Sequence, residues 1–313
     1  MQLRWSNLVL LSALPACPSA LAPFVAHWHW SLDLLACFPV QAMAWLLLTS
    51  ALLFAARRPK PAAALLALAV AAAVPVLPVF WHSPPAAIVA GPARTVRVLS
   101  LNLLRENHAR AADALAVIRE HDPDVLFCSE LTPAWLAALS NALPQFPHRS
   151  VRTDPGWFGI ALFSRWPVRA EVIPLGFEWA PAVRASVATP HGELGVLGVH
   201  TPRPGNGRRC AERDEALAAI PEALTPLPGA RLVLGDCNAT PWNAGFRDLL
   251  AATGLVPAND GWQPTWTTTL PWPLRIPIDH VLVGGGVGVL SCRVGESFGS
   301  DHLPLSATLQ LPR

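Results

Sequence analysis

The sequence predicts an α/β domain, a β-sandwich accompanied by helices, that follows an apolar segment of membrane-spanning helices. Three observations predict this organisation. Of the 313 residues, 52% are hydrophobic and only 14% are charged, which is too apolar for an ordinary soluble globule. Residues 1–90 hold four basic residues and one acid, which leaves 19 basic and 20 acidic residues for 91–313. Beyond residue 95, short β-rich runs alternate with alanine-rich helical stripes.

Three apolar runs make up the N-terminal segment. They span residues 8–26, 32–56 and 61–81. Each is close to the roughly 20 residues that a helix needs to cross about 30 Å of hydrocarbon. We therefore expect residues 1–82 to form a membrane anchor of about three transmembrane helices. Three prolines interrupt the first run, so a removable signal peptide is the alternative for it.

Basic residues predict the orientation of this anchor. The short loop Arg57-Arg58-Pro59-Lys60 joins the second and third runs, and the positive-inside rule places it in the cytoplasm together with Arg4. After three crossings the chain emerges on the outer face. Residues 83–94, rich in proline and glycine, are expected to be a linker to an extracytoplasmic domain of a multi-pass inner-membrane protein. Asp33 is expected at the level of the lipid headgroups and not buried.

Bulk charge and cysteine content exclude several classes of function. The net charge of +2 is too mild to indicate a nucleic-acid partner, and no block of lysine and arginine stands out. The six cysteines show neither a disulfide framework nor zinc-ligand spacing, so buried free thiols are expected.

Residues 95–313 are long enough to bury one substantial core. Strands are expected at residues 96–101, 124–128, 159–163, 183–188, 194–199, 231–235, 279–283 and 304–310. Helices are expected at residues 110–120 and after Thr132-Pro133 and Thr240-Pro241, where a capping residue precedes proline.

Polar side chains follow these apolar strands directly. They are Asn102, Glu130, His200, Asp236, Asn238, Asp279 and the pair Asp301-His302. Taken singly, an Asp or Asn at a strand end is usually a turn or cap residue, and a single histidine is usually packed in the core. Because six separate segments follow the same rule, they predict one polar cleft at the rim of the sandwich.

Six short motifs, in chain order, carry a resemblance to a known family. They are Leu99-Ser100-Leu101-Asn102, Ser129-Glu130, Gly198-Val199-His200, Gly235-Asp236-Cys237-Asn238, Ile278-Asp279-His280 and Ser300-Asp301-His302. This ordered set, within residues 96–311, resembles the endonuclease/exonuclease/phosphatase superfamily of deoxyribonucleases, abasic-site endonucleases, sphingomyelinases and inositol polyphosphate phosphatases. The resemblance implies a four-layer α/β sandwich, in which helices flank two packed β-sheets. The three-span anchor is similar to that of a bacterial branch of the superfamily.

Two positions depart from the family pattern. Cys237 stands where an aromatic residue is usual, and Ser129 replaces the commoner glutamine before the metal-binding glutamate. Neither departure removes a catalytic group.

The resemblance also implies roles for individual residues. Asn102, Glu130 and Asp301 would hold a divalent cation, Mg²⁺ with Mn²⁺ as the alternative, and an oxygen-only site disfavours zinc. Asp236 would accept the proton of the attacking water, and Asn238 would donate to the transition state. His302, oriented by Asp279, would contact the phosphate, and His200 would be the second imidazole there and act as the acid for the leaving group. All five are candidate catalytic residues.

Two arginines are further candidates for substrate binding, and one histidine is left out of the site. Arg165 and Arg203 are candidates for binding the substrate phosphate, because guanidinium groups suit phosphate oxygens. His280 follows Asp279 on a strand and must point to the opposite face, so it is expected to lie at the surface or behind the site.

The favoured function is a metal-dependent phosphoesterase that hydrolyses phosphate mono- or diesters at the outer face of the membrane. A tether favours a lipid-linked substrate, which it meets at high effective concentration. The alternative is an extracytoplasmic endo- or exonuclease that grips DNA with Arg203, Arg208, Arg209 and Arg213. A third hypothesis, a non-catalytic membrane receptor, is weakened by the complete set of catalytic side chains. Oligomeric state is not predicted.

Overall fold

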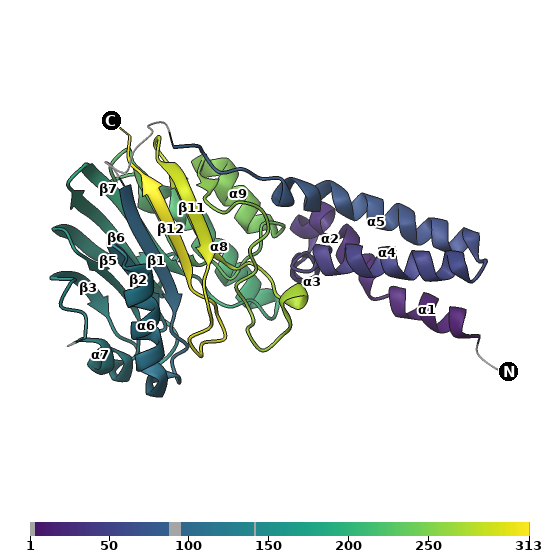
Figure 1. The fold of residues 1–313 in the computed structure, drawn as a ribbon. Coiled ribbons are helices and arrows are strands. Elements are labelled where there is room, and N and C mark those ends of the chain that lie inside the picture. The colour runs from purple at the N-terminus through teal and green to yellow at the C-terminus, as the bar shows by residue number, and fades with distance from the viewer. Residues whose placement is uncertain (1–3, 88–94, 141, 313) are drawn as a thin grey trace.

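The computed structural model describes residues 4–87, 95–140 and 142–312. It contains a sandwich of two β-sheets flanked by helices, which confirms the expected fold, and a bundle of apolar helices that projects from one end of the sandwich (Figure 1).

The first sheet has six strands in the order β11-β12-β1-β2-β4-β3. Their bounds are β1 Thr95–Asn102, β2 Val125–Ser129, β3 His148–Arg152, β4 Ile160–Ser164, β11 Gly288–Val294 and β12 Leu305–Gln310. The second sheet has the order β5-β6-β7-β8-β10-β9. Its strands are β5 Val168–Leu175, β6 Phe177–Thr189, β7 Gly192–His200, β8 Arg231–Asp236, β9 Val256–Pro257 and β10 Asp279–Gly284.

Strand alternation divides the apolar side chains between two layers. Val98 and Phe127 point into the core between the sheets, whereas Leu99 and Leu126 point outward. The outward side chains of the first sheet pack against α6 (Ala111–His121) and α7 (Pro133–Ser140), and those of the second against α8 (Gly207–Leu224) and α9 (Ala244–Thr253). Each expected strand is present. β3, β5 and β11 were not predicted, because they are partly exposed and lack a continuous apolar run.

The topology brings the polar strand ends to one edge of the sandwich. β1 runs parallel to β2, so Asn102 pairs with Ser129, the residue before Glu130. β7 runs parallel to β8, so His200 pairs with Asp236. β10 is antiparallel to β8 and begins at Asp279, opposite Asp236. Five strands therefore bring polar residues to the same edge.

The N-terminal bundle consists of helices with apolar exteriors. They are α1 Trp5–Ala13, α2 Ala16–Val25, the 3-10 turn η1 Ala26–Trp28, α3 Trp30–Leu35, α4 Pro39–Ala55 and α5 Pro59–Phe80. The stretches 5–28 and 59–80 are long and apolar enough to cross a membrane, whereas α4 is apolar but has only 17 residues. Phe54 is 71% exposed and Val74 is 63% exposed, unlike large apolar side chains on core helices of soluble proteins.

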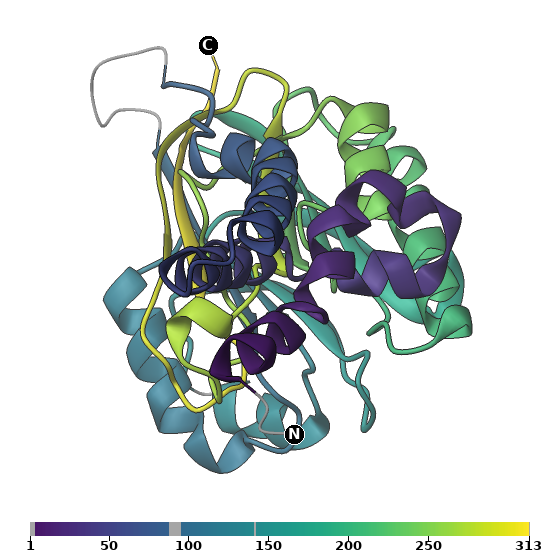
Figure 2. The same cartoon turned by 90° about the vertical axis from the view of Figure 1, so that its right-hand side faces the viewer.

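The expected second run, at residues 32–56, is not one helix. Pro39 begins α4, because proline lacks the amide hydrogen that a helix interior requires and suits the first helical position. The residues before Pro39 form α3 and a turn that lies against the sandwich. Figure 2, which looks along the bundle toward the sandwich, shows this region beside α8 and α9.

The expectation that Asp33 stays exposed at the lipid headgroups is wrong. Asp33 is buried between α3, α8 and α9, and its carboxylate accepts hydrogen bonds from Arg213 Nη2 (2.5 Å), Asn243 Nδ2 (2.9 Å) and the backbone N–H of Ala244 (2.7 Å). Arg213 is completely buried and also contacts Asp214. The sequence alone places this charge near water. It is buried here because the helices of the sandwich supply a cation, Arg213, and the N-terminus of α9.

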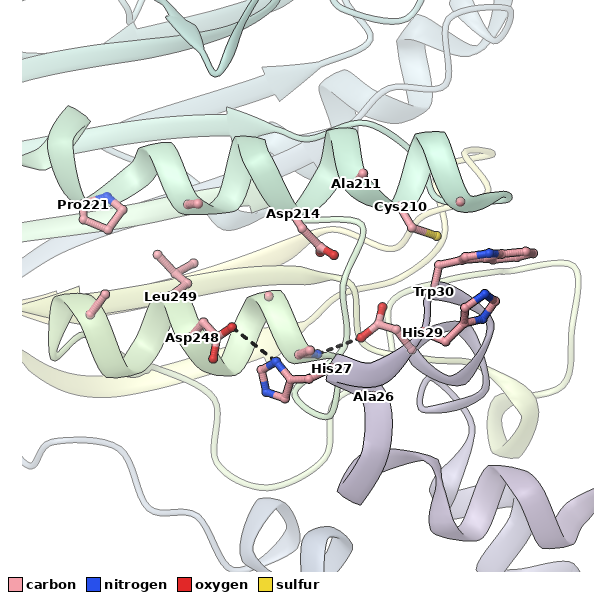
Figure 3. Close-up of a pocket in the computed structure, with 16 residues that line it drawn as sticks. Ala26, His27, His29, Trp30, Cys210, Ala211, Asp214, Pro221, Asp248 and Leu249 are labelled. Carbon is pink, nitrogen blue, oxygen red and sulfur yellow. Dashed lines mark hydrogen bonds and ion pairs between the residues drawn. The ribbon is translucent and has the colours of Figure 1, made fainter.

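A pocket of about 480 Å³ borders this ion pair, between η1–α3 and the helices α8 and α9 (Figure 3). His27 points toward Asp248 there, with 3.7 Å between His27 Nδ1 and Asp248 Oδ2. Further contacts fix the bundle to the sandwich: Gln41 Nε2 donates to the carbonyls of Pro273 and Arg275, and Trp242 Nε1 donates to the carbonyl of Pro75.

Replacing Asp33 with Asn is expected to lower the free energy of unfolding by about 3 kcal/mol, because the completely buried Arg213 then keeps only the partly exposed Asp214 as its counter-charge. The measurement is denaturant unfolding of the full chain in detergent micelles. Asp248→Asn is the matched control, since its exposed carboxylate makes only a long contact with His27 and should matter by less than about 0.5 kcal/mol. Equal stability of the two variants would contradict the role given to Asp33.

Candidate functional site

A cleft of about 750 Å³ opens at the edge where the polar strand ends meet. Its lining includes six of the residues that the sequence singled out as catalytic or metal-binding, namely Glu130, His200, Asp236, Asn238, Asp301 and His302. Asn102 and Asp279 lie directly behind them, in hydrogen-bond contact with the lining. The structure therefore brings all eight into one site.

Asp236 lies at the centre of this site and is almost completely buried. Its Oδ1 accepts a hydrogen bond from the backbone N–H of Asn238 (2.8 Å), and its Oδ2 accepts one from Asn102 Nδ2 (3.1 Å). Nε2 of His200 lies 3.6 Å from the same Oδ2, and Nε2 of His302 lies 3.7 Å from it. Both imidazoles therefore face one carboxylate.

The local backbone explains how Asp236 reaches this position. Gly235 has φ +134°, and a Cβ atom there would lie 2.0 Å from the carbonyl oxygen of Val199 on the neighbouring strand. Only glycine allows β8 to approach β7 so closely at its end. Glu130 (φ +58°) and Asn238 (φ +46°) also have left-handed backbone conformations, which turn both side chains into the cleft and are uncommon outside glycine.

His302 and Asp279 form a hydrogen-bonded pair, with 2.8 Å between Nδ1 and Oδ2. Thr265 Oγ1 donates to the same carboxylate oxygen at 2.6 Å and so fixes its orientation. This arrangement keeps a proton on Nδ1, which donates to Asp279, and leaves Nε2 facing Asp236 and the cleft.

Asn102 bridges two carboxylates. Its Nδ2 donates to Glu130 Oε1 and to Asp236 Oδ2, each at 3.1 Å, and its Oδ1 accepts from the backbone N–H of Leu104 at 3.1 Å. The amide hydrogens of Asn102 therefore face the site, whereas its oxygen faces the backbone. In this arrangement Asn102 orients the carboxylates, and Glu130 and Asp301 offer the oxygen atoms that a cation could use.

Burial and neighbouring charges shift the protonation of these groups. Burial raises the pKa of Asp236 to about 6, although His302 acts against this shift. Burial lowers the pKa of His302, but the charges of Asp279 and Asp236 outweigh it and raise that pKa to about 10. Burial lowers the pKa of His200. The site thus combines a weakly acidic carboxylate, a protonated imidazole and a neutral one.

The acidic side chains fit a hard divalent cation. Burial raises the pKa of Glu130, and the nearby charge of Asp301 adds to this shift. Two carboxylates in one confined cleft repel each other, and a cation that binds oxygen would neutralise both. Among the described residues, Asp236, Asp279 and His302 are the group of three side chains whose ligand atoms lie close enough together to share an ion, within 4.8 Å of one another. Because Asp279 Oδ2 and His302 Nδ1 are hydrogen-bonded to each other, the Glu130 side of the cleft is the alternative place for a cation.

Arg165 does not belong to the cleft. β4 runs antiparallel to β2, so residues after Ser164 lie at the opposite end of the sheet from Glu130. There Arg165 pairs with Asp122 and Asp124. Arg203 does line the cleft, with its guanidinium 5.4 Å from the centre of the Trp266 ring. The alternation of the strand separates His280 from the site as expected, but His280 is buried against Phe246 and does not lie at the surface. Its Nε2 donates to the carbonyl oxygen of Ala239 at 2.8 Å.

The structure adds contacts that the sequence did not predict. Thr265 orients Asp279, and Trp266 donates from Nε1 to Asp301 Oδ2 at 3.0 Å. Leu34, Cys37 and Phe38, from the joint between α3 and α4, form part of the cleft wall. Asp33 and Pro39 were the available signs in the sequence that the apolar run 32–56 is not one continuous helix.

Comparison with known families identifies this arrangement. The sequence profile of the Endonuclease/Exonuclease/phosphatase family matches residues 99–302. The chain belongs to this family. Members of the family are phosphoester hydrolases and typically depend on a divalent metal, so the chain has the fold and family of a phosphoesterase. No curated protein matches the chain.

Solved structures share the endonuclease/exonuclease/phosphatase fold with this chain. D. rerio TDP2, in complex with a single-strand DNA product, is 18% identical with a TM-score of 0.60, over 69% of this chain and 99% of that one. An endonuclease/exonuclease/phosphatase from Beutenbergia cavernae is 21% identical with a TM-score of 0.57, over 70% and 72%. Sphingomyelinase C from Streptomyces griseocarneus is 18% identical with a TM-score of 0.53, over 68% and 99%. At these identities the likeness concerns the fold alone.

Proposed function

We propose that the protein is a divalent-metal-dependent phosphoesterase that hydrolyses a lipid-linked phosphate ester at the outer face of the cytoplasmic membrane. One observation carries this proposal: the cleft that holds Asp236 and His302 is walled on one side by Leu34, Cys37 and Phe38 of the apolar N-terminal segment. A site formed jointly by a membrane anchor and a phosphoesterase domain lies where a lipid headgroup can reach it.

We infer that residues 1–82 are the anchor, 83–94 the linker and 95–313 the catalytic domain. Part of the linker, residues 88–94, lies outside the described residues, whereas Ala86 pairs with Val289 at the edge of the first sheet.

The distribution of basic residues supports the orientation of the anchor. Arg58 Nη1 donates to Asn7 Oδ1 at 2.6 Å, so the loop between α4 and α5 lies beside the start of α1, at the end of the bundle away from the sandwich (Figure 1). Arg4, Arg57, Arg58 and Lys60 thus gather at one end and the catalytic domain lies at the other. With α4 as the middle of three crossings, the positive-inside rule places the domain outside.

We propose Glu130 and Asp301 as the metal ligands. Asn102 either holds Glu130 in place through the hydrogen bond from its Nδ2, or rotates so that its amide oxygen becomes a further ligand. Because the donors are oxygens, Mg²⁺ fits this site, Mn²⁺ could substitute for it, and zinc is disfavoured. When bound, the cation would neutralise phosphate oxygens and polarise the phosphorus centre.

The remaining side chains transfer protons or donate hydrogen bonds to the phosphate. Asp236, whose pKa burial raises to about 6, accepts the proton of the attacking water. The protonated His302, held by Asp279, donates from Nε2 to a non-bridging phosphate oxygen. Asn238 uses one amide hydrogen on the carbonyl of Thr201 (2.9 Å) and offers the other to the transition state. A bound phosphate would raise the pKa of His200, which then protonates the leaving oxygen.

Glu130→Gln is expected to weaken Mg²⁺ binding at least about tenfold, because it removes a buried anionic ligand. Isothermal titration calorimetry of the full chain in micelles measures this without turnover. Glu106→Gln removes an exposed acid that pairs with Arg105 and serves as the control. If both variants bound Mg²⁺ as the unaltered chain does, Glu130 would not be a ligand.

The function itself is tested with a panel of phosphate esters: p-nitrophenyl phosphate, bis(p-nitrophenyl) phosphate, phosphatidic acid in vesicles and plasmid DNA. We expect Mg²⁺-dependent hydrolysis of a lipid ester, abolished by chelator, with kcat about 10²–10⁴-fold lower in His302→Ala.

The nuclease alternative has one observation in its favour, since Arg203, Arg208 and Arg209 line the cleft. Efficient cutting of DNA with no action on lipid would establish it.

Phe38→Ala should lower kcat/KM on vesicle-bound phosphatidic acid about tenfold and affect p-nitrophenyl phosphate much less, because the apolar wall contacts only a lipid tail. Phe54→Ala is the matched control, since Phe54 is exposed at the far end of the bundle. A parallel loss on both substrates would mean that Phe38 supports the fold and not lipid binding.

A further inference from the structure

We propose that Arg203, Arg208 and Arg209 form a second anion subsite in the cleft, which selects amphiphilic substrates that carry another phosphate beside the one hydrolysed. This inference rests on the proposed phosphoesterase function and specifies its substrate class. The scissile phosphate lies at His200, Asp236 and His302, the second phosphate at the three guanidinium groups, and the apolar tail at Leu34 and Phe38.

The three arginines come from one short segment that follows a catalytic strand. Arg203 lies three residues after His200, and Arg208 and Arg209 lie in the first turn of α8, whose N-cap is Asn206. All three are exposed and line the same cleft as Asp236 and His302. A ligand phosphate in the cleft can therefore meet them without any rearrangement of the backbone.

Their charges are poorly balanced by the protein. Among the described residues, no carboxylate lies within ion-pair distance of Arg203 or Arg209, and the nearest to Arg208 is Glu212, at 3.7 Å. The first turn of α8 contains no acid, so two cations face the positive end of a helix dipole. By contrast, Arg213, one turn further along, is neutralised by Asp33 and Asp214. An anionic ligand would offset both the excess charge and the dipole.

The apolar wall and these cations line the same cleft. The wall comes from Leu34 and Phe38, which follow the start of α3. In the neighbouring pocket the start of α3 packs against the start of α8, because a Cβ atom on Gly207 would lie 3.1 Å from the indole of Trp30. The cleft thus combines candidate catalytic groups, cations and an apolar surface from the N-terminal segment.

This combination favours a diphosphorylated lipid over a nucleic acid. Residues 91–313 have 19 basic and 20 acidic residues, so the cationic patch is local and does not extend along a path that a polynucleotide could follow. The apolar wall has no partner on a sugar-phosphate backbone, whereas an acyl or prenyl chain covers it. A planar guanidinium group can bind two oxygens of a phosphate through two of its N–H groups.

The reaction changes only the terminal ester. For a lipid R–O–PO₃²⁻, the water oxygen bonds to phosphorus, the P–O bond to R breaks, and the proton taken from water returns to the leaving oxygen, which yields R–OH and inorganic phosphate. The second phosphate stays in the lipid and serves only for binding.

The test compares two lipids with the same tails and the same terminal monoester in phosphatidylcholine vesicles: dioleoyl phosphatidylglycerol phosphate, which carries a second phosphate, and dioleoyl phosphatidic acid, which does not. We expect Arg208→Gln/Arg209→Gln to lower the ratio of kcat/KM for the first lipid over the second about tenfold, and Arg208→Lys/Arg209→Lys to restore part of it. Arg119→Gln/Arg293→Gln, which removes two exposed arginines outside the cleft, should leave the ratio unchanged.

Binding provides a readout that does not need turnover. Titration calorimetry of the Asp236→Asn chain with the dihexanoyl forms of both lipids should show the same preference, lost with the two glutamines. Absent hydrolysis with this binding preference intact would overturn the proposed function and leave the subsite standing. The subsite would be overturned if the two-glutamine variant lost kcat/KM equally on both lipids, or if the Asp236→Asn chain bound both lipids equally. It would also be overturned if that variant lost plasmid binding more than lipid binding, in a salt-dependent way.

Discussion

The buried ion pair between Asp33 and Arg213 joins the two parts of this molecule, and the shape of the cleft depends on it. Asp33 comes from the apolar N-terminal segment, whereas Arg213, Asn243 and Ala244 come from helices that cover the second sheet. Because the pair is desolvated, its geometry is strict: a buried carboxylate must keep all its donors or lose several kcal/mol. That requirement holds the joint between α3 and α4 against α8 and makes Phe38 part of the cleft wall.

The catalytic edge has the opposite electrostatic character. Asp33 is matched by one cation, Arg213. By contrast, the four carboxylates Glu130, Asp236, Asp279 and Asp301 lie around two imidazoles, with a pKa of about 6 for Asp236 and about 10 for His302. Left-handed backbone at Glu130 and Asn238 adds local strain. The sandwich stays stable despite this charge repulsion and strain, because its inner core and the layers beneath both pairs of helices are continuous and apolar. A cation and a phosphate would complete the charge balance that the protein alone leaves unequal.

Much of the site could be predicted from sequence because strand ends are a local feature. An apolar run followed at once by Asn102, Glu130, His200 or Asp236 is visible without coordinates, and β-sheet pairing then brings such ends together. Arg165 shows where this argument fails. It also follows an apolar strand, but β4 is antiparallel to β2, so its end lies at the far edge. Strand direction is a property of the sheet and is not encoded in five residues.

The sequence by itself determined the composition of the parts: an apolar segment with basic residues at one end, alternating strands, and an ordered set of carboxylates, amides and imidazoles. These follow from hydropathy, periodicity and residue chemistry, which are local. Only the tertiary structure decided that residues 32–38 leave the apolar bundle, that Asp33 is buried, and that Leu34 and Phe38 face the same cleft as Arg208. The reason is that a charge or an apolar side chain can change its environment through partners more than a hundred residues away, and pairing of that kind has no signature in the neighbouring sequence.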